Sequence, residues 1–403
     1  MRTRLLSKSR CTPRRCFLMA RTWDDFGGTC ARRTNPRGQR MIDARKFLFA
    51  IILFVWTIAG CAAPASVSAP RADGLSAPQV ATLDSLQKVD DHPLYTMRYI
   101  GAYDARAPLG SVIASREAAK QSPNRNVEIA SSQNPFLAMT KPAWGCSLFA
   151  ALGDPGAMLY GRNFDWDHSP AVLLFTEPPN GYASVSMVDI AYLGFTGNRA
   201  NSIADLSLAE RRALLRAPSL PFDGMNARGL VVGMAAVPPG NMAHDPSKPT
   251  IDSLRVIREM LDHAATVDEA VALMRRYNID FTGGPPIHYL VADASGRAAL
   301  IEFYQGKLIV LPNGTQWHHA TNFIRSSVEN AQGQCWRYDS LARQLTLAQG
   351  RANGQDAMKL LRDVSQNNTQ WSIVYGMSTG EIRVTMGRRY ENAHTFKLKM
   401  ENK

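Results

Sequence analysis

The spacing of apolar positions divides the chain into many short predicted strands with a few predicted helices between them. Apolar runs that alternate with polar residues, or that end at Gly, Pro, Asn or Asp, are typical of strands. We predict strands at His92–Tyr103, Cys146–Leu152, Ala157–Asn163, Ala171–Thr176, Tyr182–Leu193, Gly229–Val237, Ile287–Ala292, Ala298–Tyr304, Lys307–Leu311, Trp371–Gly376, Glu381–Thr385 and Thr395–Met400. Apolar residues at steps of three and four predict helices. These helices are Val80–Val89, Ile251–His263, Val267–Tyr277, Cys335–Thr346 and Asp356–Val364.

The order of these segments indicates the fold class. Strands come first, two neighbouring helices follow near the middle of the chain, and more strands and helices follow them. A parallel α/β sheet would instead alternate strands and helices regularly. We therefore predict an α+β layered fold.

The first sixty residues indicate a targeting segment. Met41–Lys46 is a short positively charged start, and Phe47–Ile58 is a twelve-residue apolar run. A run of this length is short for a membrane span and normal for the core of a signal peptide. The small residues before Cys61 resemble the bacterial lipobox, in which the cysteine is lipidated and becomes the mature N-terminus. An ordinary signal peptide followed by an incidental cysteine is the alternative.

This interpretation sets the N-terminal boundaries. We expect residues 1–40 to be an upstream extension from a mis-chosen start codon, and residues 41–60 to be the lipoprotein signal peptide. Residues 61–76 then form a flexible linker rich in Pro, Ala and Ser. The protein is expected to be an exported bacterial lipoprotein, held on the periplasmic side of the cell envelope by a lipid at Cys61.

The charge distribution argues against a nucleic-acid partner. The formal net charge of the chain is +12, but residues 1–60 contain 13 Lys or Arg and 3 Asp or Glu, which is +10. The remaining residues therefore carry only +2. A protein that binds nucleic acid through its folded part needs a basic surface there, so we expect no nucleic-acid partner.

The cysteine count leaves two thiols in the predicted globular part. Cys11, Cys16 and Cys30 lie in the expected extension and Cys61 is the lipidation candidate, so Cys146 and Cys335 remain. An exported protein could join these two in a disulfide. That bond would consume the one thiol with a chemical context, and we predict that it does not form.

The context of Cys146 is a predicted hairpin. Gly153-Asp154-Pro155-Gly156 is a turn signal, so the strand that begins near Cys146 should be followed by an antiparallel partner that ends near Arg162 and Asp165. A thiol, a guanidinium and a carboxylate would then meet at one end of the hairpin. A nearby cation lowers the pKa of a thiol, and a thiolate is a nucleophile. The carboxylate could hold a protonated α-amino group.

The segment resembles a known family of N-terminal-nucleophile hydrolases. Its Cys-Ser…Gly-Arg-Asn-Phe-Asp-Trp pattern is similar to that of the choloylglycine hydrolase, penicillin V acylase and acid ceramidase superfamily, although many members have threonine where this chain has Ser147. Three later segments agree in order and approximate spacing. They are Phe222–Leu230, Ala320–Phe323 and Cys335–Tyr338. The resemblance implies an αββα sandwich of two antiparallel sheets between helical layers.

The resemblance also implies roles for individual residues. Cleavage of the chain between Gly145 and Cys146 would make Cys146 an N-terminal nucleophile whose own amine is the general base. Asp165 would hold that amine, and Arg162 would stabilise the thiolate.

Three more positions carry over from the later segments. Asn322 would donate its side-chain amide to the oxyanion, helped by backbone N–H groups near Asn226. Arg337 would complete the polar site. Arg325 lies close to Asn322 in the sequence and competes with Arg337 for this place, and the resemblance favours Arg337.

The implied activity is hydrolysis of a linear, non-peptide amide of a small N-acyl amine through a thioester. Candidate substrates are N-acylethanolamines, ceramide-like lipids, conjugated bile acids, penicillin V and N-acyl homoserine lactones. Residues 77–145 would be a pro-region and residues 146–403 the catalytic domain. Fragment 61–145 is expected to stay bound after cleavage, and the pattern leaves the oligomeric state open. An acyltransferase with the same nucleophile and a non-catalytic lipoprotein that binds an acylated ligand are the alternatives.

Histidines offer two weaker interpretations. His168 could form a Cys/His pair of the thiol-protease kind, but no other feature of the chain matches such proteases. His318 and His319 could suggest a metal, but neighbouring residues on a strand point in opposite directions and no third ligand is evident. We expect neither a metal nor an organic cofactor, and a structural role for Cys335.

Overall fold

Strands that are buried on both faces form two stacked sheets. The computed structural model describes residues 74–104, 145–282 and 284–401, all within one compact unit, Ala69–Lys403. The expected extension, the signal peptide, Cys61 and the linker up to residue 73 lie outside the described residues, as does the part of the expected pro-region from 105 to 144.

The first sheet has the strand order β1-β2-β5-β6-β7-β8-β11-β12-β13. Its strands are β1 (Gln87–Asp90), β2 (Leu94–Tyr99), β5 (Ala171–Thr176), β6 (Ser184–Asp189), β7 (Asp223–Asn226), β8 (Val231–Ala236), β11 (Ile287–Ala292), β12 (Ala298–Tyr304) and β13 (Lys307–Pro312). The second sheet has the order β14-β3-β4-β15-β16-β17. Its strands are β14 (Trp317–Ala320), β3 (Gly145–Ala151), β4 (Leu159–Asp165), β15 (Thr369–Gly376), β16 (Glu381–Met386) and β17 (His394–Lys397).

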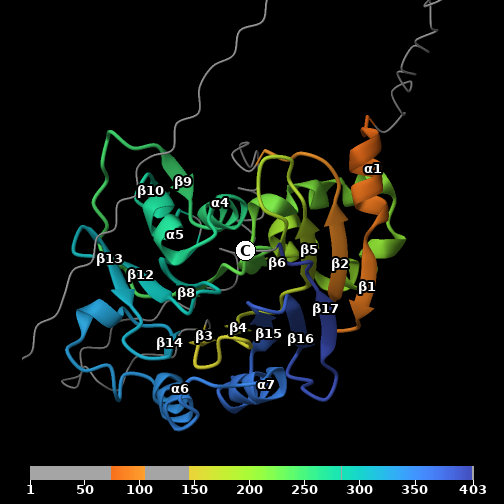
Figure 1. The fold of residues 1–403 in the computed structure, drawn as a ribbon. Coiled ribbons are helices and arrows are strands. Elements are labelled where there is room, and N and C mark those ends of the chain that lie inside the picture. Colours follow the sequence, from red (N-terminus) through yellow and green to blue (C-terminus); the bar gives the residue numbers. More distant parts are fainter. Residues whose placement is uncertain (1–73, 105–144, 283, 402–403) are drawn as a thin grey trace, which may run out of the picture. The chain divides into compact units, whose positions relative to one another are not determined.

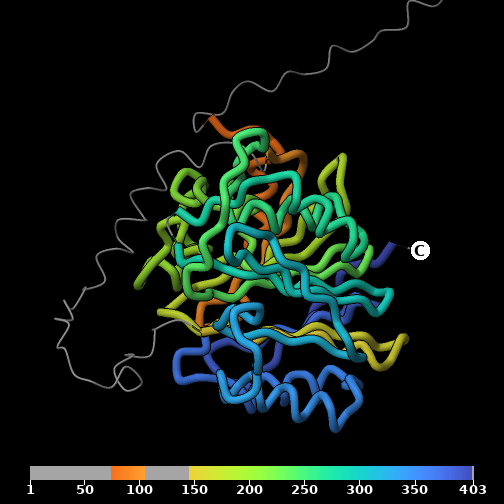
Figure 2. Tube along the Cα trace, turned by 90° about the vertical axis from the view of Figure 1, so that its left-hand side faces the viewer, coloured from red at the N-terminus to blue at the C-terminus, as the bar shows by residue number. Residues whose placement is uncertain are grey.

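Helices cover the outer face of each sheet. In Figure 1, α4 (Arg255–His263) and α5 (Val267–Met274) lie on the first sheet, and α6 (Trp336–Leu347) and α7 (Gly354–Asp363) lie on the second. Figure 2, turned by 90°, shows the same succession of layers, with α6 and α7 below the sheets. The predicted αββα sandwich is confirmed.

The alternation of side chains along β3 assigns its two faces. Leu148 and Ala150 belong to the core between the sheets, whereas Phe149 and Ala151 pack with α6 and α7. Cys146 has the parity of Leu148 and therefore faces the inter-sheet core. A third core lies under α1 (Ala77–Asp84) and the 3-10 segment Arg212–Ser219.

The first sheet departs from antiparallel pairing at one junction. Strand β2 pairs with β5 in parallel, over the register from Leu94↔Ala171 to Tyr99↔Thr176. Parallel neighbours need a long connection, and here it contains the β3–β4 hairpin of the other sheet. The remaining strand pairs of both sheets are antiparallel. A separate two-stranded sheet, β9 (Thr250–Asp252) with β10 (Asn278–Asp280), is parallel.

Element boundaries differ where one apolar spacing continues across a turn. The helix predicted at Val80–Val89 ends at Asp84, and the chain re-enters as β1 at Gln87. The predicted strand Tyr182–Leu193 is β6 followed by the short 3-10 helix Ile190–Leu193. Within the described residues, no helix is long and apolar enough to cross a membrane.

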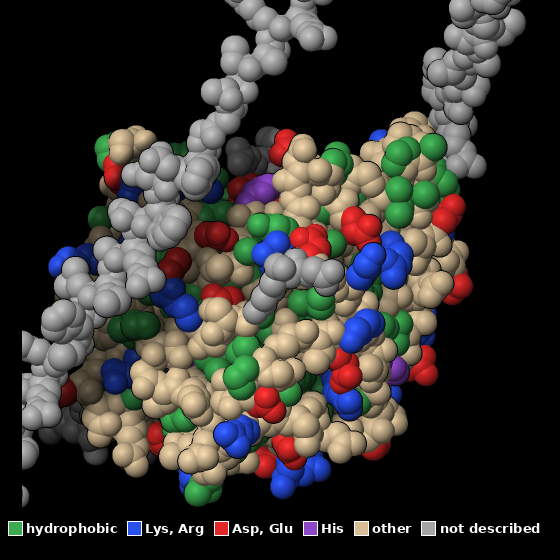
Figure 3. Space-filling view, viewed as in Figure 1, with side chains coloured by type: hydrophobic (Ala, Val, Ile, Leu, Met, Phe, Trp, Pro, Cys, Tyr) green, Lys and Arg blue, Asp and Glu red, His purple; other side chains and the backbone are tan. Residues whose placement is uncertain are grey.

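The visible surface mixes both signs of charge. On the face shown in Figure 3, acidic and basic side chains are interspersed with neutral ones. A broad field of one sign, which a nucleic acid would need, is not present among the described residues of this face.

Candidate functional site

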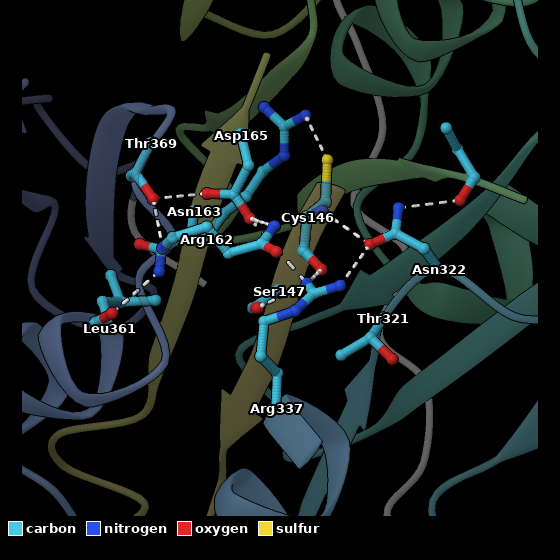
Figure 4. Close-up of polar contacts among 12 residues, drawn as sticks. Cys146, Ser147, Arg162, Asn163, Asp165, Thr321, Asn322, Arg337, Leu361 and Thr369 are labelled. Carbon is cyan, nitrogen blue, oxygen red and sulfur yellow. Dashed lines mark hydrogen bonds and ion pairs between the residues drawn. The ribbon is translucent and has the colours of Figure 1, made fainter. Parts of the chain in front are cut away.

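The β3–β4 hairpin brings three predicted residues together. Gly145 pairs with Asp165, Cys146 with Phe164 and Leu148 with Arg162 in the antiparallel register. The thiol near the start of β3 therefore lies at the same end of the hairpin as the guanidinium of Arg162 and the carboxylate of Asp165 on β4. This is the arrangement that the turn signal predicted. Figure 4 shows the three side chains around the first residues of β3.

Cys146 is buried and contacts Arg162 on β4 and Asn322 in the segment after β14. Cys146 is 3% exposed, and its Sγ lies 3.7 Å from Nη2 of Arg162. Its backbone N–H donates to Oδ1 of Asn322 at 2.7 Å. This N–H belongs to the peptide bond that is predicted to be cut, so Asn322 holds the nitrogen of that bond in place (Figure 4).

The surroundings of the Cys146 thiol raise its pKa above the ordinary value. Burial is the largest influence and raises the pKa of Cys146. Arg162 and Arg337 lower this pKa, Asp165 raises it, and the net shift is upward. The expectation that a guanidinium would lower this pKa identifies a real contribution but not the outcome, because desolvation of the thiolate outweighs it. A nucleophile in this state needs a base to take its proton.

Arg162 is anchored by a carboxylate that the sequence analysis missed. Its Nη1 forms an ion pair with Asp223, and both side chains are fully buried. Asp223 also accepts from Tyr375 Oη at 2.5 Å, while Arg162 Nε donates to the Met234 carbonyl at 3.2 Å. Burial lowers the pKa of Arg162, and Asp223 together with Cys146 raises it above its ordinary value. An Asp before the Gly-Met-Asn of an apolar segment was the available signal.

Arg337 and Asn322 meet at the backbone of Cys146. Arg337 lies in the first turn of α6 and donates to the Cys146 carbonyl, to Ser147 Oγ at 3.1 Å and to Asn322 Oδ1 at 2.9 Å. Asn322 follows β14 and donates from Nδ2 to the Ala236 carbonyl at 2.8 Å. One oxygen of Asn322 therefore accepts from both the scissile nitrogen and a guanidinium. Arg325 instead donates to the Val328 carbonyl.

Asp165 is fixed by two further missed residues. Its Oδ1 accepts from Thr369 Oγ1 at 2.5 Å and its Oδ2 accepts from Gln366 Nε2 at 2.7 Å. A Cβ on Gly145 would lie 2.1 Å from Gln366 Nε2 and 3.0 Å from Asp165 Oδ2. The residue before Cys146 is therefore packed directly against the carboxylate and its partner, and only glycine fits without displacement.

Asn226 does not join this cluster, which corrects the prediction. Its Nδ2 donates to the carbonyls of Leu261 and Ala264 at the end of α4, and its Oδ1 accepts from the backbone of Arg228 and Leu230. Both amide hydrogens are thus used in holding a helix end and a turn. The backbone N–H groups of Asn226 and Ala227 are also occupied, by Leu230 and Ala183. The side-chain amide and the backbone N–H of Asn226 are therefore committed to partners within the fold.

A mostly apolar pocket opens beside Cys146. Four aromatic residues form one wall and contact one another: Phe164, Trp166, Tyr192 and Phe222. The β9–α4 turn and the β10–β11 connection also line the pocket, with Asp252, Ser253, Leu254, Thr282, Gly284, Pro285 and Ile287. Such a concave, largely apolar site with few polar groups is typical of small-molecule binding.

The contacts of the histidines support neither a Cys/His pair nor a metal site among the described residues. The rings of His168 and His92 lie 5.3 Å apart in a tilted arrangement, and His318 Nε2 donates to the Leu311 carbonyl at 2.9 Å. Burial lowers the pKa of His319 to about 3. Cys146 and Cys335 are both free thiols, as predicted. In the described part of the chain, no group of three or more His, Cys, Asp or Glu could hold a metal.

A comparison with protein families matches the part of the chain that contains the later residues of this site. Residues 221–382 match the family model of acyl-coenzyme A:6-aminopenicillanic acid acyl-transferase. The match confirms the predicted resemblance to the N-terminal-nucleophile superfamily. It includes Asp223, Asn322 and Arg337, whereas Cys146 and Arg162 lie before the matched residues.

Solved structures of two enzymes are also similar to this chain. A mutant conjugated bile acid hydrolase from Clostridium perfringens is 16% identical, with 64% of this chain and 93% of that chain covered and a TM-score of 0.45. Penicillin V acylase from Agrobacterium tumefaciens is 17% identical, with 63% and 86% covered and a TM-score of 0.43.

Proposed function

We propose that this protein hydrolyses the linear amide bond of a small N-acyl amine, with Cys146 as a nucleophile freed by self-cleavage. The observation that carries the proposal is the position of Cys146. It begins a buried strand at the base of an apolar pocket, with a guanidinium at its sulfur and an ordered amide at its nitrogen. A structural cysteine needs none of these neighbours.

The first step would cut the chain. The Cys146 thiol adds to the carbonyl carbon of Gly145, the C–N bond breaks, and the nitrogen takes a proton to become the free amine. Water then hydrolyses the thioester to a Gly145 carboxylate and a thiol. Asn322 accepts from the nitrogen of this bond, and Asp165 packs against Gly145, so the new ammonium group would form near acceptors that can hold it.

The second reaction would use the same atoms on a substrate. The unprotonated amine of Cys146 takes the thiol proton, the sulfur attacks the substrate carbonyl, and the amine returns the proton to the leaving nitrogen. Arg162 stabilises the thiolate, and Asp223 keeps Arg162 in position. The second Nδ2 hydrogen of Asn322 remains available for the oxyanion, because the structure uses one for Ala236.

Acyl transfer is a second candidate, favoured by the acyl-transferase family model that residues 221–382 match. Both reactions share the thioester and differ in what attacks it, water or an amine. Adding hydroxylamine during turnover separates them. A transferase yields mainly the hydroxamate at low hydroxylamine concentration, whereas a hydrolase yields mainly the free acid.

The test of self-cleavage is the intact mass of protein that starts after Cys61, beside its Cys146→Ala variant. We expect two fragments that meet between Gly145 and Cys146 for the unchanged chain, and one uncut chain for the variant. An amide panel is then read on the cleaved protein. A folded chain that stays whole would favour the non-catalytic lipoprotein that binds an acylated ligand.

A further inference from the structure

A buried histidine–carboxylate pair is hydrogen-bonded to the segment that carries Asn322. His288 on β11 and Glu302 on β12 are 1% and 0% exposed, and His288 Nδ1 lies 3.1 Å from Glu302 Oε1. The register pair Tyr289↔Ile301 brings the two onto neighbouring strands of the first sheet. A buried ionisable pair is costly to desolvate unless further hydrogen bonds satisfy it. The other hydrogen bonds of this pair therefore indicate what it does.

Glu302 fixes the far end of the segment. Its Oε1 accepts from the backbone N–H of Arg325 at 2.6 Å, and its Oε2 accepts from the backbone N–H and the Oγ of Ser326 at 2.8 and 2.7 Å. Burial raises the pKa of Glu302, but the hydrogen bond and the charge of His288, together with hydrogen bonds from Ser326 and Arg325, lower it below its ordinary value. Hydrogen bonds to an ionised carboxylate are stronger than those between neutral groups, so this end is firmly held.

His288 fixes the near end of the segment. Its Nε2 lies 2.8 Å from the carbonyl oxygen of Thr321, the residue before Asn322 (Figure 4). Because a carbonyl oxygen only accepts, Nε2 carries the hydrogen of this bond. Among the described residues, the side-chain hydrogen bonds of His288 and Glu302 go to each other or to residues 321–326. The pair thus holds one six-residue segment from both ends.

Asn322 is the residue of this segment that reaches the predicted cut. Its Oδ1 accepts from the Cys146 N–H at 2.7 Å and from Arg337 Nη2 at 2.9 Å. Such bonds weaken steeply when their geometry is distorted, and a displacement of about 1 Å in a catalytic group can cost about 100-fold in rate. The action of this side chain therefore depends on the backbone on either side of it.

We propose that His288 and Glu302 are positioning residues that hold Asn322 against the Cys146 N–H during self-cleavage and at the oxyanion during amide hydrolysis. Both act through the backbone of residues 321–326 and not on the reacting atoms. This inference rests on the proposed function and adds two residues to it. It also explains why a histidine and a carboxylate occupy buried positions of two strands that are otherwise mostly apolar.

The first experiment is a double-mutant cycle on self-cleavage, followed as the fraction of cut chain over time in protein that starts after Cys61. We expect Glu302→Gln and His288→Gln each to slow the cut by about 10- to 100-fold. Asn322→Ala removes the side chain on which the pair acts, so in that background each substitution should cost less than about threefold. Equal losses with and without the Asn322 side chain, or no loss at all, overturn the inference.

Asp293→Asn is the matched control. Asp293 is 2% exposed, follows β11 and accepts from the backbone N–H groups of Val267 and Ser295. It is therefore a buried carboxylate that holds other parts of the chain. We expect Asp293→Asn to lower the free energy of unfolding by urea, as Glu302→Gln does, while self-cleavage changes less than about twofold. Equal slowing by both variants would mean that loss of stability alone slows the cut, and it would overturn the inference.

The second readout is the division of the effect between kcat and KM on the cut protein, with penicillin V and N-lauroylethanolamine as probes. Glu302→Gln and His288→Gln should each lower kcat by about tenfold or more. KM should change less than about threefold, because an oxyanion donor acts mainly in the transition state. A raised KM with unchanged kcat would place the pair in substrate binding and overturn the inference.

Ser326→Ala is read in the same cycle in case the two buried variants do not fold. Ser326 is half-buried, and this change removes a single hydrogen bond to Glu302. A few-fold slowing of the cut that disappears in the Asn322→Ala background supports the inference, and an unchanged rate overturns it.

The outcomes separate this inference from the function on which it rests. If the unchanged chain cuts itself and the cycle shows equal losses, the positioning role fails and self-cleavage stands. If the chain cuts itself but hydrolyses neither probe, the cycle on self-cleavage still decides the inference. If the folded chain neither cuts itself nor hydrolyses a probe, the proposed function fails and the inference fails with it.

Discussion

At the scale of single residues, Gly145 has no room for a side chain. Its missing side chain leaves the space that Gln366 and Asp165 occupy. A larger residue there must displace the amide that donates to Asp165, and a shift of about 1 Å in a catalytic group is costly in rate. Glycine is therefore favoured at this position because a side chain would clash, and not because of its backbone freedom.

We expect Gly145→Ala to slow self-cleavage by about 100-fold or more, measured as the fraction of cut chain over time. Combining it with Gln366→Ala should restore part of the rate, because the nearest atom that the new methyl group meets is Gln366 Nε2.

Gly284→Ala is the control for this pair of variants. Gly284 lines the same pocket, and a Cβ there meets nothing within 4 Å. It should cut at the rate of the unchanged chain. If Gly145→Ala also cuts at that rate, the packing of Gly145 has no bearing on cleavage.

The buried ion pair of Arg162 and Asp223 supports a second prediction at this scale. Asp223→Asn leaves the guanidinium buried without a carboxylate, which typically costs on the order of 3 to 5 kcal/mol. We expect a fall of this size in the free energy of unfolding by urea, with impaired self-cleavage. The exposed pair Arg297–Asp268 provides the comparison: Asp268→Asn should change stability little. Similar small losses for both variants would contradict a structural role for the buried pair.

At the scale of elements, β2 ties the N-terminal segment to the rest of the fold. It lies between β1 and β5, and Leu94, Tyr95 and Met97 are buried. The fragment before the predicted cut therefore contributes β1 and β2 to the first sheet, whereas the cut itself lies at the start of β3 in the second sheet.

The fragment that contains β2 should therefore remain bound after cleavage. We expect both fragments to co-elute in native size-exclusion chromatography and to separate in denaturant. Replacing Leu94 and Met97 by Asp should release the fragment or prevent folding, because charged side chains would enter the core. Separation of the unchanged fragments under native conditions would show that β2 is not needed to hold them.

Elements with a strong apolar pattern were predictable, and short ones were not. Strands β5, β11 and β12 have the predicted bounds because each is an apolar run between turn signals. Strands β7 and β14 were missed, since Asp223–Asn226 and Trp317–Ala320 show no alternation. The parallel pairing of β2 with β5 joins residues far apart in sequence, and a local pattern does not report such a pairing.

The site follows the same division. The hairpin turn alone placed Cys146 beside Arg162 and Asp165. Asn322 and Arg337 came only from the resemblance to a family, because they reach Cys146 from β14 and α6. Gln366 had no motif, and Asp223 lay in the Phe222–Leu230 segment, where only Asn226 was given a role. Each of the two acts through a partner that only tertiary packing brings near.

At the scale of the whole molecule, one buried acid should make stability depend on pH. Asp189 caps the 3-10 helix that carries Tyr192 of the pocket. Burial raises its pKa from 3.8 to about 7, although hydrogen bonds from Ser169 and Ala191 lower it. Because the folded pKa is the higher one, the unfolded chain releases this proton first. The contribution is full below about pH 4 and is lost as pH rises through about 7.

We expect Asp189→Asn to remove this loss, which is on the order of a few kcal/mol. The free energy of unfolding of the variant should exceed that of the unchanged chain by more at pH 8 than at pH 5, as measured by urea denaturation at both values. Asp245→Asn is the contrasting control, because hydrogen bonds from Ser247 lower the pKa of the exposed Asp245. A gap for Asp189→Asn that does not change with pH would contradict the prediction.

The position of β2 inside the first sheet has a consequence for reversibility. Before the cut, the chain can unfold and refold as one molecule, and its yield does not depend on concentration. If the chain is cut before Cys146 as proposed, β1 and β2 will belong to a separate polypeptide that must find its place beside β5 by diffusion. Refolding would then be a bimolecular reaction. A cut copy that unfolds in dilute solution would be lost, and its lifetime would be set by how slowly it unfolds.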